Sequence, residues 1–157
     1  MALFKKTWKH FWLMQHGQPL QQSHLQVETD LKAVTNVLLW FEAFTSPLLT
    51  AQLQSQCQLA FVEGFTNAVR HAHEHLPQST LIDLEVTLFP NCLEMRIWDW
   101  GQPFDLQAKL QSLCQEELDP LEKEGGRGLM FMHQLMDEVS YVRLPDQRNC
   151  LMLRKNL

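Results

Sequence analysis

Hydrophobic and polar residues alternate in several short stretches of this chain, which is the pattern of half-buried β-strands. The clearest pair is Leu81–Phe89 and Leu93–Trp100, and the short link that contains Pro90 and Asn91 predicts a hairpin between them. The same pattern predicts three further strands, the last two of which form a second hairpin: His24–Thr29, Glu138–Leu144 and Cys150–Arg154. Pairing between neighbours in the sequence favours a largely antiparallel sheet.

Between these strands, hydrophobic residues recur at the spacing of one face of an α-helix. The predicted helices are Leu31–Phe44 with Asp30 as its N-cap, Thr50–His75 and Leu129–Met136, whereas Phe104–Leu121 is ambiguous. We therefore expect an α+β two-layer sandwich, in which a mixed, mostly antiparallel sheet is covered on one face by helices. Residues 1–22 are expected to form an N-terminal arm, and residues 23–157 the folded domain.

Composition narrows the class of protein. The chain has 157 residues, of which 45% are hydrophobic, so it can bury the core of one ordinary domain. Its net charge of −5 argues against general binding to nucleic acid. No hydrophobic stretch approaches the roughly 20 residues that a membrane span needs. The 4 cysteines are scattered and form no CxxC pair, which favours reduced thiols in a cytoplasmic protein over a zinc site.

The N-terminal sequence MALFKKTWKHFWLM is basic and aromatic, and it lacks the long hydrophobic region and the cleavage site of a signal peptide. Two interpretations stay open. The segment is either an amphipathic arm that contacts a membrane or a partner, or a segment that packs on the domain or on a second subunit, and we favour packing. The aromatic candidates for a subunit interface are Trp8, Phe11, Trp12 and Trp40.

The run from Phe61 to Ala72, FVEGFTNAVRHA, is expected to be a two-sided helix. One side can pack on a core, and it consists of Phe61, Phe65, Ala68, Val69 and Ala72. The other side carries a carboxylate, a carboxamide, a guanidinium and an imidazole within two turns: Glu63, Asn67, Arg70 and His71. This set differs from the Lys/Glu mixture of a merely solvated face, which is the alternative interpretation.

Two more histidines follow at spacings of two residues, His73 and His75. Residues two apart point in different directions on a helix, so the three histidines do not converge on one metal ion. We interpret them as helix-end histidines near the C-terminal dipole.

A second block, Asp99-Trp-Gly-Gln-Pro-Phe-Asp105, ends a predicted strand. A carboxylate at this place can accept a hydrogen bond from the exocyclic amine of adenine, where guanine presents a carbonyl. Gly101 lets the backbone pass close to a flat ligand. The alternative is a strand-end aspartate that caps a turn.

A third block, Glu124-Gly-Gly-Arg-Gly-Leu129, opens a predicted helix. The amides of Gly125, Gly126 and Gly128, together with the N-terminus of the helix, can hold anionic oxygens. Arg127 and Lys123 are further candidates for contact with a phosphate. A flexible linker, with Arg127 in solvent, is the alternative.

These three blocks, in this order, resemble the GHKL (Bergerat-fold) ATP-binding superfamily. Its patterns E-x-x-x-N-A-x-x-H-A, D-x-G-x-P-F-D and E-G-G-x-G-L are matched by Glu63–Ala72, Asp99–Asp105 and Glu124–Leu129. Within the superfamily, the short single-domain form is similar to the bacterial anti-sigma regulatory factors, which are serine/threonine protein kinases. The resemblance covers roughly Leu25 to Leu153.

The resemblance implies a role for each block. Asp99 would bind the adenine amine, Asn67 would coordinate Mg²⁺, and Glu63 would be the general base of phosphoryl transfer. A mobile ATP lid would span Leu106–Glu124. The implied nucleotide-binding residues are Asn67, Arg70, His71, Asp99, Gly101, Phe104, Lys123, Gly125, Gly126, Arg127, Gly128 and Leu129.

The resemblance also implies an activity, namely that of a cytoplasmic ATP- and Mg²⁺-dependent serine/threonine kinase in a bacterial partner-switching system that regulates transcription. Its substrate would be a STAS-domain antagonist, its second partner a sigma factor or another regulator, and it would form a homodimer. Two places depart from the family pattern: Arg148-Asn149-Cys150 replaces a Gly-Thr or Gly-Asn segment, and Glu124 stands where some of these kinases have arginine. A non-catalytic nucleotide-binding module that sequesters a partner is therefore the alternative. A detached histidine-kinase ATPase domain and a nucleic-acid-binding protein are less favoured.

Overall fold

The computed structural model describes residues 17–115 and 126–157, with side chains for 17–112 and 126–157. The described strands form one sheet in the order β1-β2-β3-β5-β4, and all four pairings are antiparallel. The strands are β1 (Gln21–Glu28), β2 (Leu81–Leu88), β3 (Cys92–Asp99), β4 (Glu138–Arg143) and β5 (Asn149–Asn156). Both predicted hairpins are confirmed, and the last strand in the sequence lies between β3 and β4.

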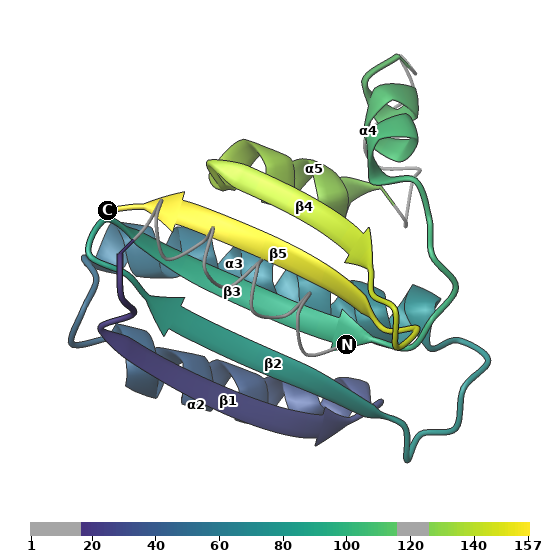
Figure 1. Cartoon of the computed structure of the whole chain (residues 1–157), viewed down its shortest axis with the longest axis horizontal. Helices are drawn as coiled ribbons and strands as arrows, with labels where there is room; N and C mark the ends of the chain where they lie inside the picture. Colours follow the sequence, from purple (N-terminus) through teal and green to yellow (C-terminus); the bar gives the residue numbers. More distant parts are fainter. Residues whose placement is uncertain (1–16, 116–125) are drawn as a thin grey trace.

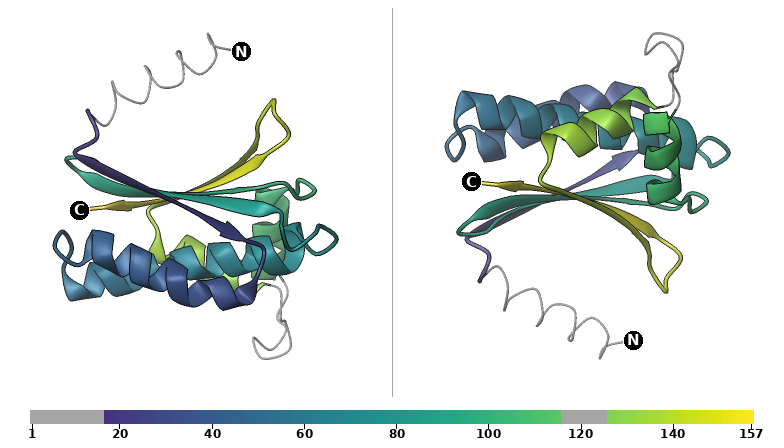
Figure 2. Two further views of the ribbon diagram at one scale, coloured as in Figure 1. Left: turned by 90° about the horizontal axis from the view of Figure 1, so that it is seen from below. Right: turned by 90° about the horizontal axis from the view of Figure 1, so that it is seen from above.

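The helical segments are η1 (Leu31–Ala33), α2 (Val34–Thr45), α3 (Ala51–Asn67), η2 (Ala68–Ala72), α4 (Leu106–Gln115) and α5 (Arg127–Leu135). Helices α2, α3 and α5 lie on the same face of the sheet (Figure 2), and α4 lies near the start of α5 (Figure 1). The predicted two-layer α+β sandwich is therefore confirmed. None of the described helices is both long enough and apolar enough to cross a membrane.

Local sequence signals account for the helix starts. Asp30 caps η1, because its Oδ1 accepts a hydrogen bond of 2.9 Å from the amide of Lys32. Thr50 caps α3 through the amide of Leu53. Asp105 caps α4, because its Oδ1 accepts from the amide of Ala108 at 3.0 Å. The ambiguity at the beginning of the proposed lid is thereby resolved as helix over Leu106–Gln115.

Several boundaries differ from the prediction, and two of them are shifted by three residues or more. Strand β1 begins at Gln21, earlier than the predicted His24, because its pairing with β2 starts at Gln21 opposite Leu88. The predicted helix to His75 ends earlier: α3 stops at Asn67, and the next five residues form the π-helical segment η2. The π-helical geometry is seen in the 2.9 Å hydrogen bond from the His73 amide to the Ala68 carbonyl, which lies five residues earlier in the chain.

The core lies between α2, α3, α5 and the sheet. Phe41 and Phe61 stack with ring centroids 5.2 Å apart, and both are buried together with Phe65. Burial of each such side chain contributes roughly 1.5–3 kcal/mol. Trp40, a predicted interface residue, instead packs against this core and donates through Nε1 to Ser23 Oγ at 2.9 Å. The other interface candidates, Trp8, Phe11 and Trp12, lie outside the described residues.

Candidate nucleotide site

The first block lies at the end of α3 and in η2, with its two sides as predicted. Phe61, Phe65 and Ala68 are buried, and Val69 and Ala72 are partly buried. Glu63 and Asn67 are half-buried, whereas Arg70 and His71 are exposed. The π-helical turn follows Asn67 directly, and such turns occur frequently at functional sites.

The third block meets the first at Gly128. A Cβ on Gly128 would lie 2.5 Å from Glu63 Oε2 and 3.5 Å from Asn67 Nδ2, so a larger residue here would displace the Glu63 carboxylate. Helix α5 begins at Arg127, with Gly126 as its N-cap residue. The N-terminal end of α5, where the helix dipole is positive, therefore lies beside Glu63 and Asn67 of α3.

The second block meets the first at Gly101. A Cβ on Gly101 would lie 2.3 Å from the Ala72 carbonyl oxygen, so the strand-end backbone passes directly against η2. Packing against η2 thus accounts for glycine at this position, and the predicted approach to a flat ligand stays a prediction. Three blocks that are separated in the sequence thus converge at the C-terminal end of β3.

Asp99 is buried at this end of β3, with 4% of its surface exposed. Its Oδ1 accepts hydrogen bonds from the amide of Gly101 at 2.8 Å and from Asn149 Nδ2 at 2.7 Å. Among the residues that the structure describes, none binds Oδ2. One carboxylate oxygen is therefore fixed by the protein, while the other keeps its capacity to accept a hydrogen bond.

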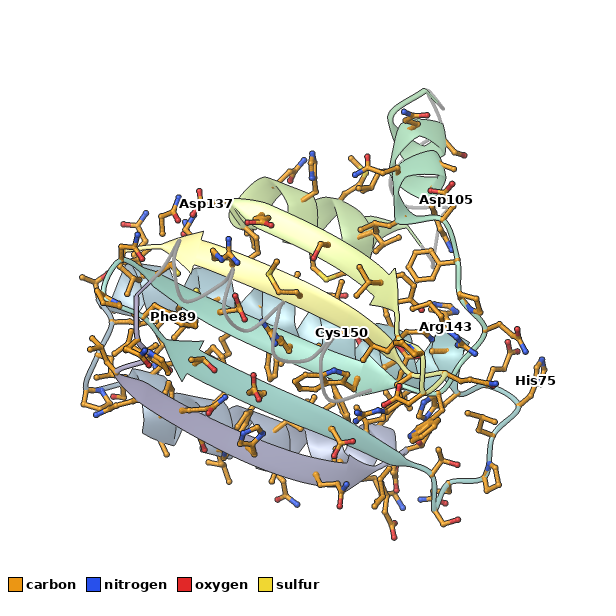
Figure 3. All side chains as sticks on the ribbon, in the orientation of Figure 1. His75, Phe89, Asp105, Asp137, Arg143 and Cys150 are labelled. Atoms are coloured by element: carbon orange, nitrogen blue, oxygen red, sulfur yellow. The ribbon has the colours of Figure 1, made fainter. Side chains whose placement is uncertain are left out.

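Asn149 and Arg143 belong to this site, although neither was predicted as a site residue and Asn149 was noted only in a segment that departs from the family pattern. Asn149 is opposite Asp99 in the pairing of β3 with β5 and opposite Arg143 in the pairing of β5 with β4. Arg143 donates to Asn149 Oδ1 at 3.0 Å and to the Gly101 carbonyl at 2.8 Å. Figure 3 shows Arg143 at this end of the sheet. The signal in the sequence that could have identified this part of the site is the polar residue Asn149 at the start of the last strand.

A cavity of about 320 Å³ opens between the three blocks. Its wall includes six of the predicted nucleotide-binding residues: Asn67, His71, Asp99, Gly101, Phe104 and Leu129. Hydrophobic side chains from β3, β5 and α5 complete the wall: Ile97, Leu151 and Met132. Arg70, Gly126, Arg127 and Gly128 do not line it, and Lys123 and Gly125 lie outside the described residues. A largely hydrophobic cavity with few polar groups is typical of a small-molecule site.

Aromatic rings from the second block and from β4 meet at the mouth of this cavity. Phe104 packs on Tyr141 with ring centroids 4.4 Å apart, and Lys109 Nζ lies 5.7 Å from the Phe104 ring centroid. The Tyr141 hydroxyl is buried and has no hydrogen-bond partner within the described ranges. Burial raises the pKa of Tyr141, so the hydroxyl stays protonated.

His73 lies at a helix end as predicted, because it is the C-cap residue of η2. The burial of this residue was not predicted: only 1% of its surface is exposed, and its ring contacts Thr29 after β1 and Trp100 after β3. Its Nε2 accepts from the amide of Trp100 at 2.8 Å, and its Nδ1 lies 2.7 Å from Thr29 Oγ1. Burial lowers the pKa of His73 from the usual 6.5, and the Asp99 carboxylate opposes part of this shift.

Curated relatives match this chain over part of its length. It is 36% identical over 87 residues to the serine-protein kinase RsbW of Staphylococcus epidermidis, which covers 53% of this chain and 54% of that protein. It is 36% identical over 86 residues to the serine-protein kinase RsbW of Bacillus subtilis, with 52% of each chain covered. The chain thus spans about half the length of the curated relatives it matches.

Solved structures share the fold. The RsbU and RsbW domains of Rv1364c from Mycobacterium tuberculosis match with a TM-score of 0.62 and 14% identity, covering 87% of this chain and 32% of that chain. The SiaB–SiaC complex from Pseudomonas aeruginosa matches with a TM-score of 0.60 and 13% identity, covering 95% and 96%. The family described as histidine kinase-like ATPase domain matches residues 27–155. This chain therefore belongs to the histidine kinase-like ATPase domain family, and its fold and three blocks are those expected of the GHKL superfamily.

Proposed function

We propose that this chain is a kinase that binds Mg-ATP in the cavity at the end of β3 and transfers the γ-phosphoryl group to a serine or threonine of a partner protein. The observation that carries the proposal is the convergence of Glu63, Asn67 and Gly128 beside the cavity that Asp99 lines. The relatives named serine-protein kinase support the same activity.

The adenine ring is proposed to lie against Asp99 and Gly101. Oδ2 of Asp99 would accept a hydrogen bond from the exocyclic amine, which guanine lacks at that position. Gly101 and Ala72 both line this part of the cavity, and neither has a large side chain that would fill it. Hydrophobic contacts from Ile97 and Leu129 suit the faces of a purine ring.

The phosphates are proposed to lie between α3 and the start of α5. The amides at Gly126, Arg127 and Gly128 stand at a helix N-terminus, where partial positive charge favours anionic oxygens. Lys123 and Gly125, which fall outside the described residues, stay predictions for this part of the site. Arg70 and His71 are exposed beside it and remain predicted phosphate contacts.

Asn67 fits a magnesium ligand, because its carboxamide supplies a neutral oxygen at the wall of the cavity. Within the described ranges, no three His, Cys, Asp or Glu side chains gather where they could hold a metal ion. A hard cation at this place would take most of its oxygens from phosphates and water, which is the usual preference of Mg²⁺. Its contribution would be to offset charge on the transferring phosphoryl group.

Glu63 fits the general base. It lies one helical turn before Asn67, on the side of α3 that faces α5. A serine hydroxyl of the partner would attack the γ-phosphorus while its proton passes to Glu63. The bond to the bridging oxygen would break, and ADP would leave. Base catalysis of this kind typically contributes 10²–10⁴-fold in rate.

The proposed partner is a STAS-domain antagonist, and the proposed outcome of its phosphorylation is that a sigma factor or a similar regulator becomes sequestered. The relatives named RsbW and the structural match to the SiaB–SiaC complex support a partner-switching role. A homodimer in the cytoplasm remains part of the proposal.

Calorimetric titration with a non-hydrolysable ATP analogue, with and without Mg²⁺, tests the nucleotide site. We expect magnesium-dependent binding that Asn67→Ala removes and Glu63→Gln retains. Phosphate transfer to a STAS-domain protein from the same organism should fall about 100-fold or more in Glu63→Gln. Glu74→Gln makes the same charge change in an exposed residue after η2 and is the matched control. No binding to the unaltered protein would overturn the proposal, and normal transfer by Glu63→Gln would overturn the assignment of the base.

A further inference from the structure

His73 stands where three parts of the chain meet. Its own backbone closes the π-helical turn, since its amide donates to the Ala68 carbonyl. Its ring reaches Thr29, directly after β1, and Trp100, directly after β3. On one side of this junction lies the cavity proposed for the nucleotide. On the other side lies an open hollow of about 440 Å³, to whose wall His73 contributes.

The hydrogen bonds define which nitrogen of His73 carries the proton. The amide of Trp100 can only donate, so Nε2 must be the unprotonated acceptor in their 2.8 Å contact. Thr29 Oγ1 donates its own proton to the Thr80 carbonyl at 2.7 Å. The 2.7 Å contact between Thr29 and His73 is therefore donated by Nδ1–H. The bonded form is the neutral ring with its proton on Nδ1.

We propose that neutral His73 is a positioning residue for the nucleotide: it holds the Trp100 amide, and so fixes the strand-end segment from Asp99 to Gly101 against η2. This inference rests on the proposed function, because it assumes that the cavity takes an adenine nucleotide. Affinity should fall when the acceptor is lost, whether by substitution or by a second proton on the ring.

The position of the segment from Asp99 to Gly101 depends on the hydrogen bond between the Trp100 amide and His73. Trp100 lies between Asp99, whose free oxygen is the proposed adenine contact, and Gly101, which packs on Ala72 beside His73. A second proton would place Nε2–H opposite the Trp100 N–H, so two donors would face each other. Displacement of the Trp100 backbone would move both flanking residues, and binding groups lose much of their effect when misplaced by about 1 Å.

The direction of the pH effect follows from burial. Burial lowers the pKa of His73 below 6.5, so the unfolded chain takes up the proton more readily than the folded one. The contribution of His73 to stability is complete above about pH 6.5 and is lost as the pH falls through its folded-state pKa. The charged and titratable groups around the junction are Asp99 on β3, Asp30 and Lys32 after β1, Glu74 and His75 after η2, and Arg148 over the Trp100 ring.

Two substitutions of His73 distinguish the effect of losing the hydrogen-bond acceptor from the effect of changing the volume of the side chain. In His73→Gln, the side-chain carbonyl can reach the place of Nε2 and does not titrate, whereas His73→Leu fills the space without an acceptor. At about pH 8 we expect the Gln variant to bind a non-hydrolysable ATP analogue within about threefold of the unaltered protein, and the Leu variant about tenfold more weakly. Isothermal titration calorimetry measures both, and circular dichroism checks folding.

Binding measured over a range of pH is the decisive experiment, provided that the protonation of His73 is separated from that of other groups. The comparison with His73→Gln makes this separation. The nucleotide phosphates also change charge in this pH range, and they do so equally in the unaltered protein and in His73→Gln. The ratio of their dissociation constants therefore isolates His73. As the pH falls from about 8 through the folded-state pKa of His73, the ratio should shift in favour of the Gln variant, by up to about tenfold per pH unit below that pKa. The same shift should persist when both proteins also carry His71→Gln.

Parallel pH curves for the unaltered protein and His73→Gln would overturn this inference. Unweakened binding by a folded His73→Leu at about pH 8 would overturn it as well. If the Leu variant does not fold, the pH dependence of binding by His73→Gln and by the unaltered protein still tests the inference. Failure of the unaltered protein to bind nucleotide at any pH would instead overturn the proposed function, and this inference with it.

Discussion

Two rows of side chains cross the same three strands, β3, β5 and β4, near opposite ends of the sheet. One row is Glu94, Arg154 and Glu138, and the other is Asp99, Asn149 and Arg143. Each places a carboxylate of β3 opposite a polar residue of β5. Because Glu94 and Asp99 are five positions apart on one strand, they point to opposite faces. The rows therefore share a position in the fold but differ in surroundings.

The carboxylates of the two rows differ in their hydrogen-bond and ion-pair partners. Glu94 is 2% exposed, and both of its oxygens are paired: Oε2 with Arg154 at 3.0 Å and Oε1 with Arg96 at 2.5 Å. Asp99 is equally buried, but a neutral amide and a backbone N–H share its Oδ1. A fully paired carboxylate can only hold strands together, whereas a half-paired one retains an acceptor for a ligand. The comparison thus separates a structural row from a binding row.

Breaking the structural row should have the largest effect. Arg154→Met keeps much of the volume of a 6% exposed side chain but removes the cation between Glu94 and Glu138. We expect the free energy of unfolding to fall by about 3 kcal/mol in urea titrations, because Glu94 Oε2 and Glu138 both lose their cation and Glu94 keeps only Arg96. Nucleotide affinity of the folded fraction should not change. Lys32→Met, at an exposed cation, should cost about 0.5 kcal/mol or less. Equal losses from the two variants would contradict this account.

Changing the binding row at Asp99 should alter affinity and not stability. In Asp99→Asn, the amide oxygen can keep both bonds of Oδ1, while the NH₂ group replaces the free acceptor with a donor. We expect the preference for ATP over GTP, measured by competition binding, to fall about 100-fold. An unchanged preference would show that Asp99 does not contact adenine.

Removing the support of Asp99 should have a smaller effect. Asn149→Ala deletes the 2.7 Å bond to Asp99 and the 3.0 Å bond to the Gly101 carbonyl. The carboxylate is then less well oriented, and we expect nucleotide affinity to weaken about tenfold in calorimetric titration. Asn156→Ala is the matched control, since this exposed asparagine lies at the far end of the same strand. A weaker effect at Asn149 than at Asn156 would rule out the positioning role.

The smallest effect is expected at the edge of the binding row. Tyr141→Phe removes a buried hydroxyl that has no partner within the described ranges and leaves the stacking on Phe104 in place. Because an unsatisfied buried donor costs free energy, the variant should be more stable by up to about 1 kcal/mol, seen as a higher Tm. A lower Tm would mean that the hydroxyl has a partner, such as a bound water.

The sequence was informative where the signal is local. The strands alternate, the helices carry caps such as Asp30 and Thr50, and each motif is contiguous, so the fold class and the three blocks could be predicted. Six predicted residues line one cavity for the same reason. A motif that keeps its internal spacing keeps its side chains together once its helix or strand is placed.

The missed residues depend on relations between distant segments. Asn149 gains its role from the register that sets it opposite Asp99, and no local pattern encodes that register. The position of His73 at a helix end was predicted, but its burial was not, because that depends on contacts with Thr29 and Trp100 in distant segments. Trp40 was expected at an interface, but its distant contacts with Phe61 and Ser23 place it against the core.

The place of β5 in the sheet has a consequence for the protein during its synthesis. β5 is the last of the five strands in chain order, yet it inserts between β3 and β4 and delivers Asn149 to Asp99. A nascent chain on the ribosome can form the β2–β3 hairpin early, but it leaves one edge of β3 unpaired until translation passes Asn156. Nucleotide binding at this site would therefore begin only after the final strand has emerged, and a chain cut before Asn149 would present an open sheet edge in place of a binding site.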